Sequence, residues 1–306
     1  MIPTLIYQPI SNFITWDVNP IIFEVFNREV RYYGLFFALA FLLGYQVMAY
    51  VYKKDGLRTL DVDRLSVFMV VAVIVGARLG QVLLYDPGYY FANPSEIIQI
   101  WKGGLASHGA AIGIIIAMFF YTRKPPVTNL MWMLDRIILS VPIGGALVRM
   151  GNLMNSEIYG HMTSLTWGFI FVRDPESGML PRHPTQIYEA LSYLVIFVIL
   201  FLVYRTKQGN RVKPGSLFGL FLILLFGVRF VIEFLKVQQE PFETNILNQV
   251  GLNQGQLLSI PFVLLGIYFM LSSRNKIPKM SDGRPTPLVN SANNLSEIID
   301  VEAQNI

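Results

Sequence analysis

The hydrophobic residues of this chain gather in long runs that are broken only by short polar stretches. A helix needs roughly 20 mostly apolar residues to cross a hydrocarbon layer of roughly 30 Å. Such continuous runs favour membrane spans over half-buried strands or surface helices. Seven segments qualify: residues 31–52, 64–85, 104–122, 131–150, 187–205, 216–236 and 256–273. The pattern predicts an all-α integral membrane protein with about seven transmembrane helices.

Two polar regions stand out from this pattern. Residues 151–186, between the fourth and fifth predicted spans, are long enough to form a small cap outside the membrane. Residues 279–306 are polar and are expected to form a tail without stable structure. We therefore expect one polytopic transmembrane domain over residues 1–278, in which no internal repeat is evident.

The composition agrees with a membrane protein. Hydrophobic residues make up 53% of the chain and charged residues only 14%, with a mean hydropathy of +0.48, whereas soluble domains carry about a quarter charged residues. The net charge of +4 does not indicate nucleic acid, because the basic residues lie in short loops. The chain has no cysteine, which excludes disulfides, thiolate metal sites and a thiol nucleophile of its own. The N-terminus lacks the pattern of a cleavable signal peptide, so the first span is expected to be retained.

The basic residues set the expected orientation, because cytoplasmic loops of membrane proteins are enriched in lysine and arginine. Of the 24 basic residues, fourteen lie in the loops 53–64, 122–130 and 205–215 or in the C-terminal stretch. Six fall on the opposite side: Arg28, Arg31, Lys102, Arg173, Arg182 and Lys236. The N-terminus is thus expected outside and the C-terminus inside, with the cap on the extracytoplasmic face.

Polar side chains within or beside the spans are costly in lipid and commonly mark function. With this orientation, polar groups from six predicted spans converge near the extracytoplasmic face. They are Tyr33, Arg78, His108, Arg149, Asn152, Asn155, Glu157, His183, Gln186, Tyr188, Glu189, Arg229 and Glu233. Asp135 and Arg136 lie instead near the inner end of the fourth span, where we favour a structural role through mutual pairing or the inner headgroups.

Structural explanations compete with functional ones for several of these residues. Arg229 and Glu233 are four residues apart, a spacing at which a helix forms structural ion pairs. Arg78 lies within Gly76–Gly80, a sequence that is also typical of close helix packing. Arginines near span ends commonly extend to the headgroups, and a single histidine such as His108 is usually structural. These alternatives stay open at the level of sequence.

Two short stretches favour a functional site. Residues 103–109 (GGLASHG) place glycines on both sides of His108, and glycine permits tight turns and the close approach of a ligand. Residues 149–160 (RMGNLMNSEIYG) hold a fixed cation, two amides and a carboxylate where a lipid headgroup would lie. The planar fork of arginine matches a pair of phosphate oxygens, and two arginines would hold a phosphodiester better than one.

With these two stretches the chain resembles the prolipoprotein diacylglyceryl transferase family over about residues 20 to 275. Four further fragments occur in the family's order: residues 31–34 (RYYG), 76–80 (GARLG), 183–189 (HPTQIYE) and 229–234 (RFVIEF). The chain departs from the family at two secondary positions and agrees with it at a third. Val148 stands where glycine usually precedes the signature arginine, Leu225 and Phe226 replace a tyrosine before Arg229, and Lys236 provides the usual basic residue after residues 233–234.

The resemblance implies that the diacylglyceryl group of phosphatidylglycerol moves to the lipobox cysteine of a prolipoprotein, forming a thioether and releasing glycerol phosphate. It implies catalytic roles for His108, Arg149 and Arg229. The substrate-binding residues would be Tyr33, Arg78, Asn152, Asn155, Glu157, Gly160, Gln186, Tyr188, Glu189 and Glu233. No metal or soluble cofactor is implied.

The expected partners are phosphatidylglycerol, membrane lipid and prolipoprotein signal peptides with a lipobox cysteine, without nucleic acid. The expected location is the bacterial cytoplasmic (inner) membrane, where a multi-pass monomer would face the extracytoplasmic side with its active site. A thiol of pKa ~8.5 is mostly protonated at neutral pH, so a base is needed, and His108 is the best-placed candidate.

Other classes fit less well. A secondary transporter or lipid flippase would also place charges in spans, but such proteins commonly show paired repeats and broken helices near the midplane. An intramembrane serine protease would need a serine partnered by a histidine, and only Ser107 beside His108 is a candidate. A purely structural scaffold would need no buried arginines.

Overall fold

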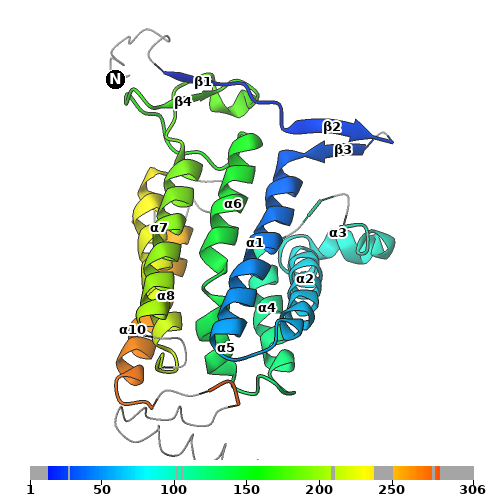
Figure 1. Ribbon diagram of the computed structural model, residues 1–306. Helices are drawn as coiled ribbons and strands as arrows, with labels where there is room; N and C mark the ends of the chain where they lie inside the picture. Colours follow the sequence, from blue (N-terminus) through cyan, green and yellow to red (C-terminus); the bar gives the residue numbers. More distant parts are fainter. Residues whose placement is uncertain are drawn as a thin grey trace, which may run out of the picture.

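The computed structural model describes residues 13–26, 28–100, 103–104, 106–207, 211–237, 251–277 and 280–282. The long helices run side by side as one bundle, and a small irregular region covers one end of it (Figure 1). The predicted tail of residues 279–306 lies outside the described residues except for residues 280–282.

Helices occur in all seven predicted apolar segments. They are α1 (Tyr32–Lys54), α2 (Leu60–Gly80), α4 (Ser107–Tyr121), α5 (Leu130–Ile137), α6 (Val141–Met154), α7 (Thr185–Thr206), α8 (Ser216–Ile232) and α10 (Gln254–Ser273). By length and composition, α1, α2 with its extension, α7, α8 with its extension and α10 can cross a membrane. The described part of the chain therefore has five candidate spans, or six when α5 and α6 count as one broken span.

The seventh predicted span is the short helix α4. It has 15 residues, a length of about 22 Å at 1.5 Å per residue, which is less than the hydrocarbon thickness. The helical class is therefore confirmed, whereas the number of seven crossings stays a prediction. The sequence also predicted one continuous fourth span, but α5 and α6 are bent by 44°. Pro142 lies in the first turn of α6, where proline is tolerated. A single helix continued from α5 through Pro142 would lose a backbone hydrogen bond and clash with the proline ring.

Short elements that the sequence did not predict decorate the bundle. A π-helical extension of α2 (Gln81–Tyr85) leads into α3 (Pro87–Ala92) and a 3-10 turn (Pro94–Glu96), and a second 3-10 turn (Glu233–Leu235) extends α8. The strands are β1 (Ile14–Trp16), β2 (Ile21–Val25), β3 (Arg28–Arg31) and β4 (Phe169–Phe171). β2 and β3 form an antiparallel hairpin, and β1 pairs in parallel with β4, with Ile14 opposite Phe169.

The bundle is built from a series of neighbouring helix pairs: α4 with α2, α2 with α1, α1 with α6, α6 with α7, α7 with α8 and α8 with α10. Glycines let α2 and α4 approach until their backbones touch. A Cβ on Gly76, Gly80, Gly109 or Gly113 would collide with the backbone of the opposite helix. The close packing expected for Gly76–Gly80 is therefore present.

Residues 155–184, here called the cap, fold between α6 and α7 over the end of the bundle where β1 and β4 lie (Figure 1). The side chain of Trp16 in β1 packs on Phe169 and donates a hydrogen bond of 3.0 Å from its Nε1 to the carbonyl of Leu153. The hydroxyl of Thr185 donates to the carbonyl of Ile158. The cap is thus attached to both the N-terminal strand and the helices beneath it.

The opposite end of the bundle, here called the tail end, is held by two buried carboxylates. Asp55 forms an ion pair of 2.9 Å with Arg136, whose side chain is 1% exposed, and accepts a hydrogen bond from Tyr204 on α7. Asp135 accepts the backbone N–H groups of Gly215 and Phe218 at the start of α8. The structural role expected for this pair is present, but the partner of Arg136 in the ion pair is Asp55.

Replacing Arg136 with methionine should lower the free energy of unfolding by about 3–5 kcal/mol, because Asp55 would remain as a buried charge without its cation. Thermal unfolding of the purified protein in detergent would measure this loss. Arg58→Met is the matched control, because it breaks an ion pair with Asp61 in which Arg58 is exposed, and it should leave the melting temperature unchanged. Equal melting temperatures for both variants would contradict the role of Arg136.

A small cluster of histidine and aromatic side chains joins the cap to the first turn of α7. His183 Nδ1 lies 3.3 Å from the Tyr188 hydroxyl, which accepts a 2.9 Å hydrogen bond from Trp167 Nε1. Burial lowers the pKa of His183 below its ordinary value, and the neighbouring His161 lowers it further. The folded cap therefore favours the neutral form of His183.

The cap should loosen as the pH falls from 7 to 5. The pKa of His183 is lower in the folded cap than in an unfolded one. Neutral His183 therefore stabilises the folded cap fully above the unfolded pKa of about 6.5. That contribution is lost as the pH falls through the lower folded value. Hydrogen exchange of residues 160–184 at several pH values would measure the opening, and His183→Gln should flatten its pH dependence. An unchanged pH dependence in that variant would assign the effect to another group.

Candidate active site

Three helices bring charged side chains together beneath the cap. Arg149 on α6 forms an ion pair of 2.8 Å with Glu189 on α7, through its Nε and Glu189 Oε2. The Glu189 side chain has no exposed surface, whereas that of Arg149 is 16% exposed. An ionised carboxylate so deeply buried needs cations around it, so Glu189 and Arg149 hold each other in place.

Lys236, directly after the 3-10 turn that ends α8, joins a second carboxylate to this pair. Its Nζ lies 2.9 Å from Glu189 Oε1 and 3.3 Å from Glu233 Oε1. Arg229, one helical turn before Glu233, lies 3.6 Å from the same Glu233 oxygen. The charges thus form a continuous series from Arg149 to Arg229, and the spacing of four residues does produce the expected ion pair.

Amide side chains connect Arg149 to the carboxylate of Glu157. An Nη1 hydrogen of Arg149 is donated to Asn152 Oδ1 at 3.1 Å, and Asn152 Nδ2 donates to Glu157 Oε1 at 2.7 Å. Asn155 Nδ2 also donates to Glu157 Oε1, at 3.2 Å. Gln186 Nε2 donates to the Glu157 backbone carbonyl at 2.7 Å. Three of the predicted residues, Asn152, Asn155 and Gln186, therefore fix the position of Glu157 or Arg149.

Tyr33 reaches this group from the first turn of α1. Its ring packs on Gly151, where any Cβ would collide with it, and its phenol lies within electrostatic range of Glu157 and Arg149. The glycine at position 151 is therefore required for the approach of α1 to α6. Tyr33 belongs to the same site as the arginines.

Gly160 brings the cap into contact with the end of α8. A Cβ at this position would collide with the carbonyl oxygen of Leu235 and with the side chains of His183 and Thr185. Gly160 and Lys236 form an isolated antiparallel β-bridge, and the N–H of Gly160 donates to the carbonyl of His183. Gly160 therefore lets two chain segments meet beside Lys236.

His108 lies elsewhere, at the start of α4. It is exposed, and its Nδ1 lies 3.2 Å from the hydroxyl of Tyr85 at the end of the α2 extension. Among the described residues, no hydrogen bond or ion pair joins His108 to the group around Arg149. A substrate would have to extend from one to the other.

The side chain of Arg78 forms hydrogen bonds with the segment between α3 and α4. Its Nε, Nη1 and Nη2 donate to four backbone carbonyls, and its guanidinium lies 4.8 Å from the centre of the Tyr90 ring. The carbonyls are those of Glu96, Ile97, Gly103 and Gly104. Tyr188 likewise points into the cap, toward His183 and Trp167. Neither residue contacts the charged group around Arg149 through a described hydrogen bond or ion pair.

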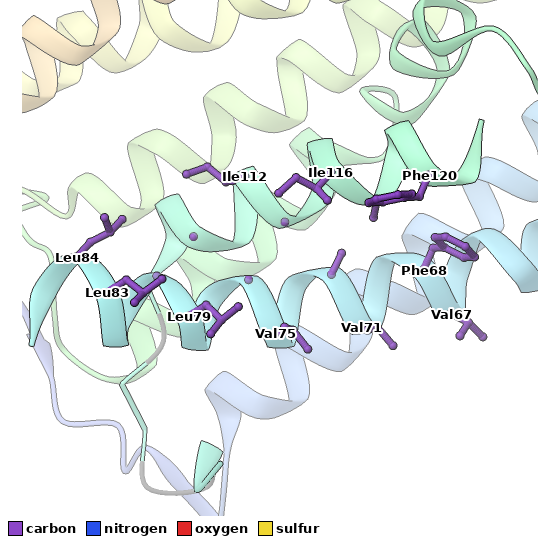
Figure 2. Close-up of a pocket in the computed structure, with 16 residues that line it drawn as sticks. Val67, Phe68, Val71, Val75, Leu79, Leu83, Leu84, Ile112, Ile116 and Phe120 are labelled. Atoms are coloured by element: carbon purple, nitrogen blue, oxygen red, sulfur yellow. The ribbon is translucent and has the colours of Figure 1, made fainter. Parts of the chain in front are cut away.

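An apolar groove runs along α2 and α4 (Figure 2). Figure 2 shows Val67, Val71, Val75 and Leu79 along α2, with Ile112 and Ile116 on α4. Its volume is about 690 Å³, and no charged side chain lines it. Leu84 and Gly109 lie at one end, and these are the neighbours of Tyr85 and His108 in the sequence. An apolar chain in this groove could therefore place a polar end beside His108.

Three residues at the charged site were missed or undervalued from sequence. Lys236 was recognised only as a usual basic residue, although it lies three residues after Glu233 and could have been read as a second ion pair on that turn. Tyr193 donates a long 3.5 Å hydrogen bond to Glu189. Asn253, in the capping box of α10, donates from its Nδ2 to the Glu233 carbonyl at 2.9 Å. No sequence pattern relates the last contact to the site, because Asn253 lies 20 residues after Glu233 in the chain.

The chemistry of the site follows from its two arginines. The side chains of Arg149 and Arg229 are partly accessible, 16% and 31% exposed, and the buried Nε of Arg229 has no hydrogen-bond partner among the described residues. Such groups suit an anion with several oxygens. Within the described part of the chain, no three His, Asp or Glu side chains group as metal ligands do.

The sequence matches known proteins over most of its length. The model of the prolipoprotein diacylglyceryl transferase family matches residues 20–272. A phosphatidylglycerol–prolipoprotein diacylglyceryl transferase of Porphyromonas gingivalis is 46% identical over 85% of this chain and 94% of its own length. Proteins with the same name from Tolumonas auensis and Chloroherpeton thalassium are 44% and 41% identical, over 84% and 86% of this chain and 96% and 95% of their own lengths. The chain belongs to the prolipoprotein diacylglyceryl transferase family.

Proposed function

We infer that this chain transfers the diacylglyceryl group of phosphatidylglycerol to the lipobox cysteine thiol of prolipoproteins. The observation that carries this proposal is the pair of partly accessible arginines, Arg149 and Arg229, each held by a buried carboxylate at one end of a bundle of apolar helices. Such a pair fits the phosphodiester of a membrane lipid. The names of the relatives supply the two substrates.

The proposed reaction is a displacement at carbon. The cysteine sulfur attacks the terminal glyceryl carbon of the diacylglyceryl group, and the bond from that carbon to the phosphate oxygen breaks. The leaving group is glycerol phosphate, whose negative charge increases as the bond breaks. Arg149 and Arg229 would stabilise that charge, because they are already held in position and need no rearrangement.

The thiol proton needs an acceptor, and His108 is the proposed base. The imidazole is exposed and lies beside the Tyr85 hydroxyl. Their neighbours in the sequence, Gly109 and Leu84, line the apolar groove. Tyr33, Asn152, Asn155 and Glu157 would contact the glycerol headgroup or hold the arginines. Gln186, Glu189 and Glu233 would act by positioning, and Arg78 and Tyr188 by organising the segments beside the site.

The proposed setting is the cytoplasmic membrane of a bacterium. The asymmetry of basic residues supports an extracytoplasmic cap and a cytoplasmic C-terminus. Seven crossings would require α4 to cross the membrane together with flanking residues. Because both substrates are anchored in lipid, a monomer could receive each of them laterally between its helices.

A transfer assay with purified protein in detergent tests the proposal. Phosphatidylglycerol and a lipobox peptide should yield glycerol phosphate and a peptide heavier by one diacylglyceryl group. Both products should be lost when serine replaces the lipobox cysteine, because its hydroxyl is far less acidic than a thiol. Folded protein that gives neither product with several lipids would refute the proposed reaction.

Replacing His108 with glutamine should lower kcat by about 10²–10⁴-fold, the usual contribution of a general base. The melting temperature should not change, because His108 is exposed. The assay should be run from pH 6 to 9, since thiolate formed at high pH would partly bypass the missing base. Wild-type turnover by this variant would exclude His108 as the base.

Arg149→Lys should lower kcat/KM by about 10²–10³-fold, because lysine keeps the charge but loses the fork that binds two phosphate oxygens. Part of the loss should appear as a higher KM for phosphatidylglycerol. Arg58→Lys is the control, since Arg58 forms an exposed ion pair with Asp61 at the tail end, away from the site. Full activity of Arg149→Lys would contradict a bidentate phosphate contact.

A further inference from the structure

We propose that Lys236 is a positioning residue that holds Glu189 and Glu233 so that Arg149 and Arg229 face one lipid phosphate. This inference rests on the proposed function and adds a residue that the reaction itself does not need as a reactant. The Nζ atom of Lys236 lies 2.9 Å from Glu189 Oε1 and 3.3 Å from Glu233 Oε1. No other described lysine lies between two buried carboxylates in this way.

Burying three charged side chains costs free energy of folding, so their presence calls for an explanation other than stability. The side chains of Lys236, Glu233 and Glu189 are 8%, 10% and 0% exposed. Charges removed from water carry a large desolvation penalty, and replacing them with apolar groups often stabilises a protein. A buried lysine between two glutamates is therefore weak evidence for stability alone, and function is the better explanation of its presence.

Each carboxylate that Lys236 holds also carries one arginine. Glu189 uses Oε2 for Arg149 and Oε1 for Lys236. Glu233 receives Arg229 at 3.6 Å and Lys236 at 3.3 Å. Without the ammonium, the two carboxylates would repel each other and would compete for the arginines. The guanidinium groups would then bind glutamate more tightly and an incoming phosphate less well.

The charges also balance in a way that favours an anion. Arg149, Arg229 and Lys236 face Glu189 and Glu233, so this group carries one net positive charge. A phosphodiester carries one negative charge and would neutralise it. Glu157 is not counted in this ion-paired group, because the amide of Asn152 lies between its carboxylate and Arg149. Removal of Lys236 would leave a neutral group with a weaker attraction for lipid phosphate.

The side chain of Lys236 can be changed without removing the docking of the cap. The cap contacts this segment through backbone atoms: Gly160 bridges Lys236, and the N–H of His161 donates to the carbonyl of Leu235. Substitutions at position 236 therefore test the ammonium itself. Lys236→Met keeps the length and removes the charge, and Lys236→Arg keeps the charge.

The test measures both turnover and equilibrium binding of fluorescent phosphatidylglycerol. Lys236→Met should lower kcat/KM by about tenfold or more, with most of the loss in KM for the lipid and a matching loss in binding. Lys236→Arg should recover most of the binding. Arg58→Met, which removes one exposed positive charge at the tail end, should bind as the wild type does.

Two outcomes would overturn the proposal: wild-type lipid binding by Lys236→Met, or equal loss in folded Lys236→Met and Lys236→Arg. Should Lys236→Met fail to fold, Glu233→Gln alone would be compared with Lys236→Met/Glu233→Gln, in which one buried carboxylate is removed with the ammonium. Weaker lipid binding by the double variant supports the proposal, and equal binding overturns it. Because binding is read separately, wild type that binds lipid without transfer would refute only the proposed reaction.

Discussion

The site depends on Glu189, a carboxylate with no contact with solvent. It sits on α7 between Arg149 of α6 and Lys236 at the end of α8, so three helices owe their relative position at the cap end to one buried anion. An unpaired charge at this depth would be strongly destabilising. The same constraint that fixes the helices thus fixes the arginines, and structure and chemistry cannot be separated at this residue.

At the tail end, a buried carboxylate also joins several helices, but there it leaves no charged group for a ligand. Asp55, Arg136 and Tyr204 join α1, α5 and α7, while Asp135 caps the start of α8. Here both members of the ion pair are almost completely buried, with 1% and 0% exposure, and neither guanidinium nor carboxylate is left for a ligand. Exposure of the cation therefore distinguishes Arg229, which we propose binds the lipid phosphate, from a structural arginine such as Arg136.

The helices could be predicted because the solvent dictates them: a run of apolar residues in lipid must satisfy its backbone internally. Most of the charged site could also be located, since Arg149, Glu189, Arg229 and Glu233 lie at corresponding ends of their helices. The contacts could not be predicted, because partners such as Asp55 and Arg136 are far apart in the sequence. The strands escaped prediction for another reason: three to five residues are too few to show an alternating pattern.

The pairing of β1 with β4 has a consequence for how the protein is made. Ile14 is synthesised long before Phe169, and α1, α2, α4 and α6 lie between them in the chain. The first strand must therefore wait, unpaired, until most of the bundle has been inserted, since contacts between distant segments form late. The two strands can pair only after α6 has been made, although α7, α8 and α10 still follow in the chain. A chain arrested before residue 169 would leave Trp16 and its strand without a partner.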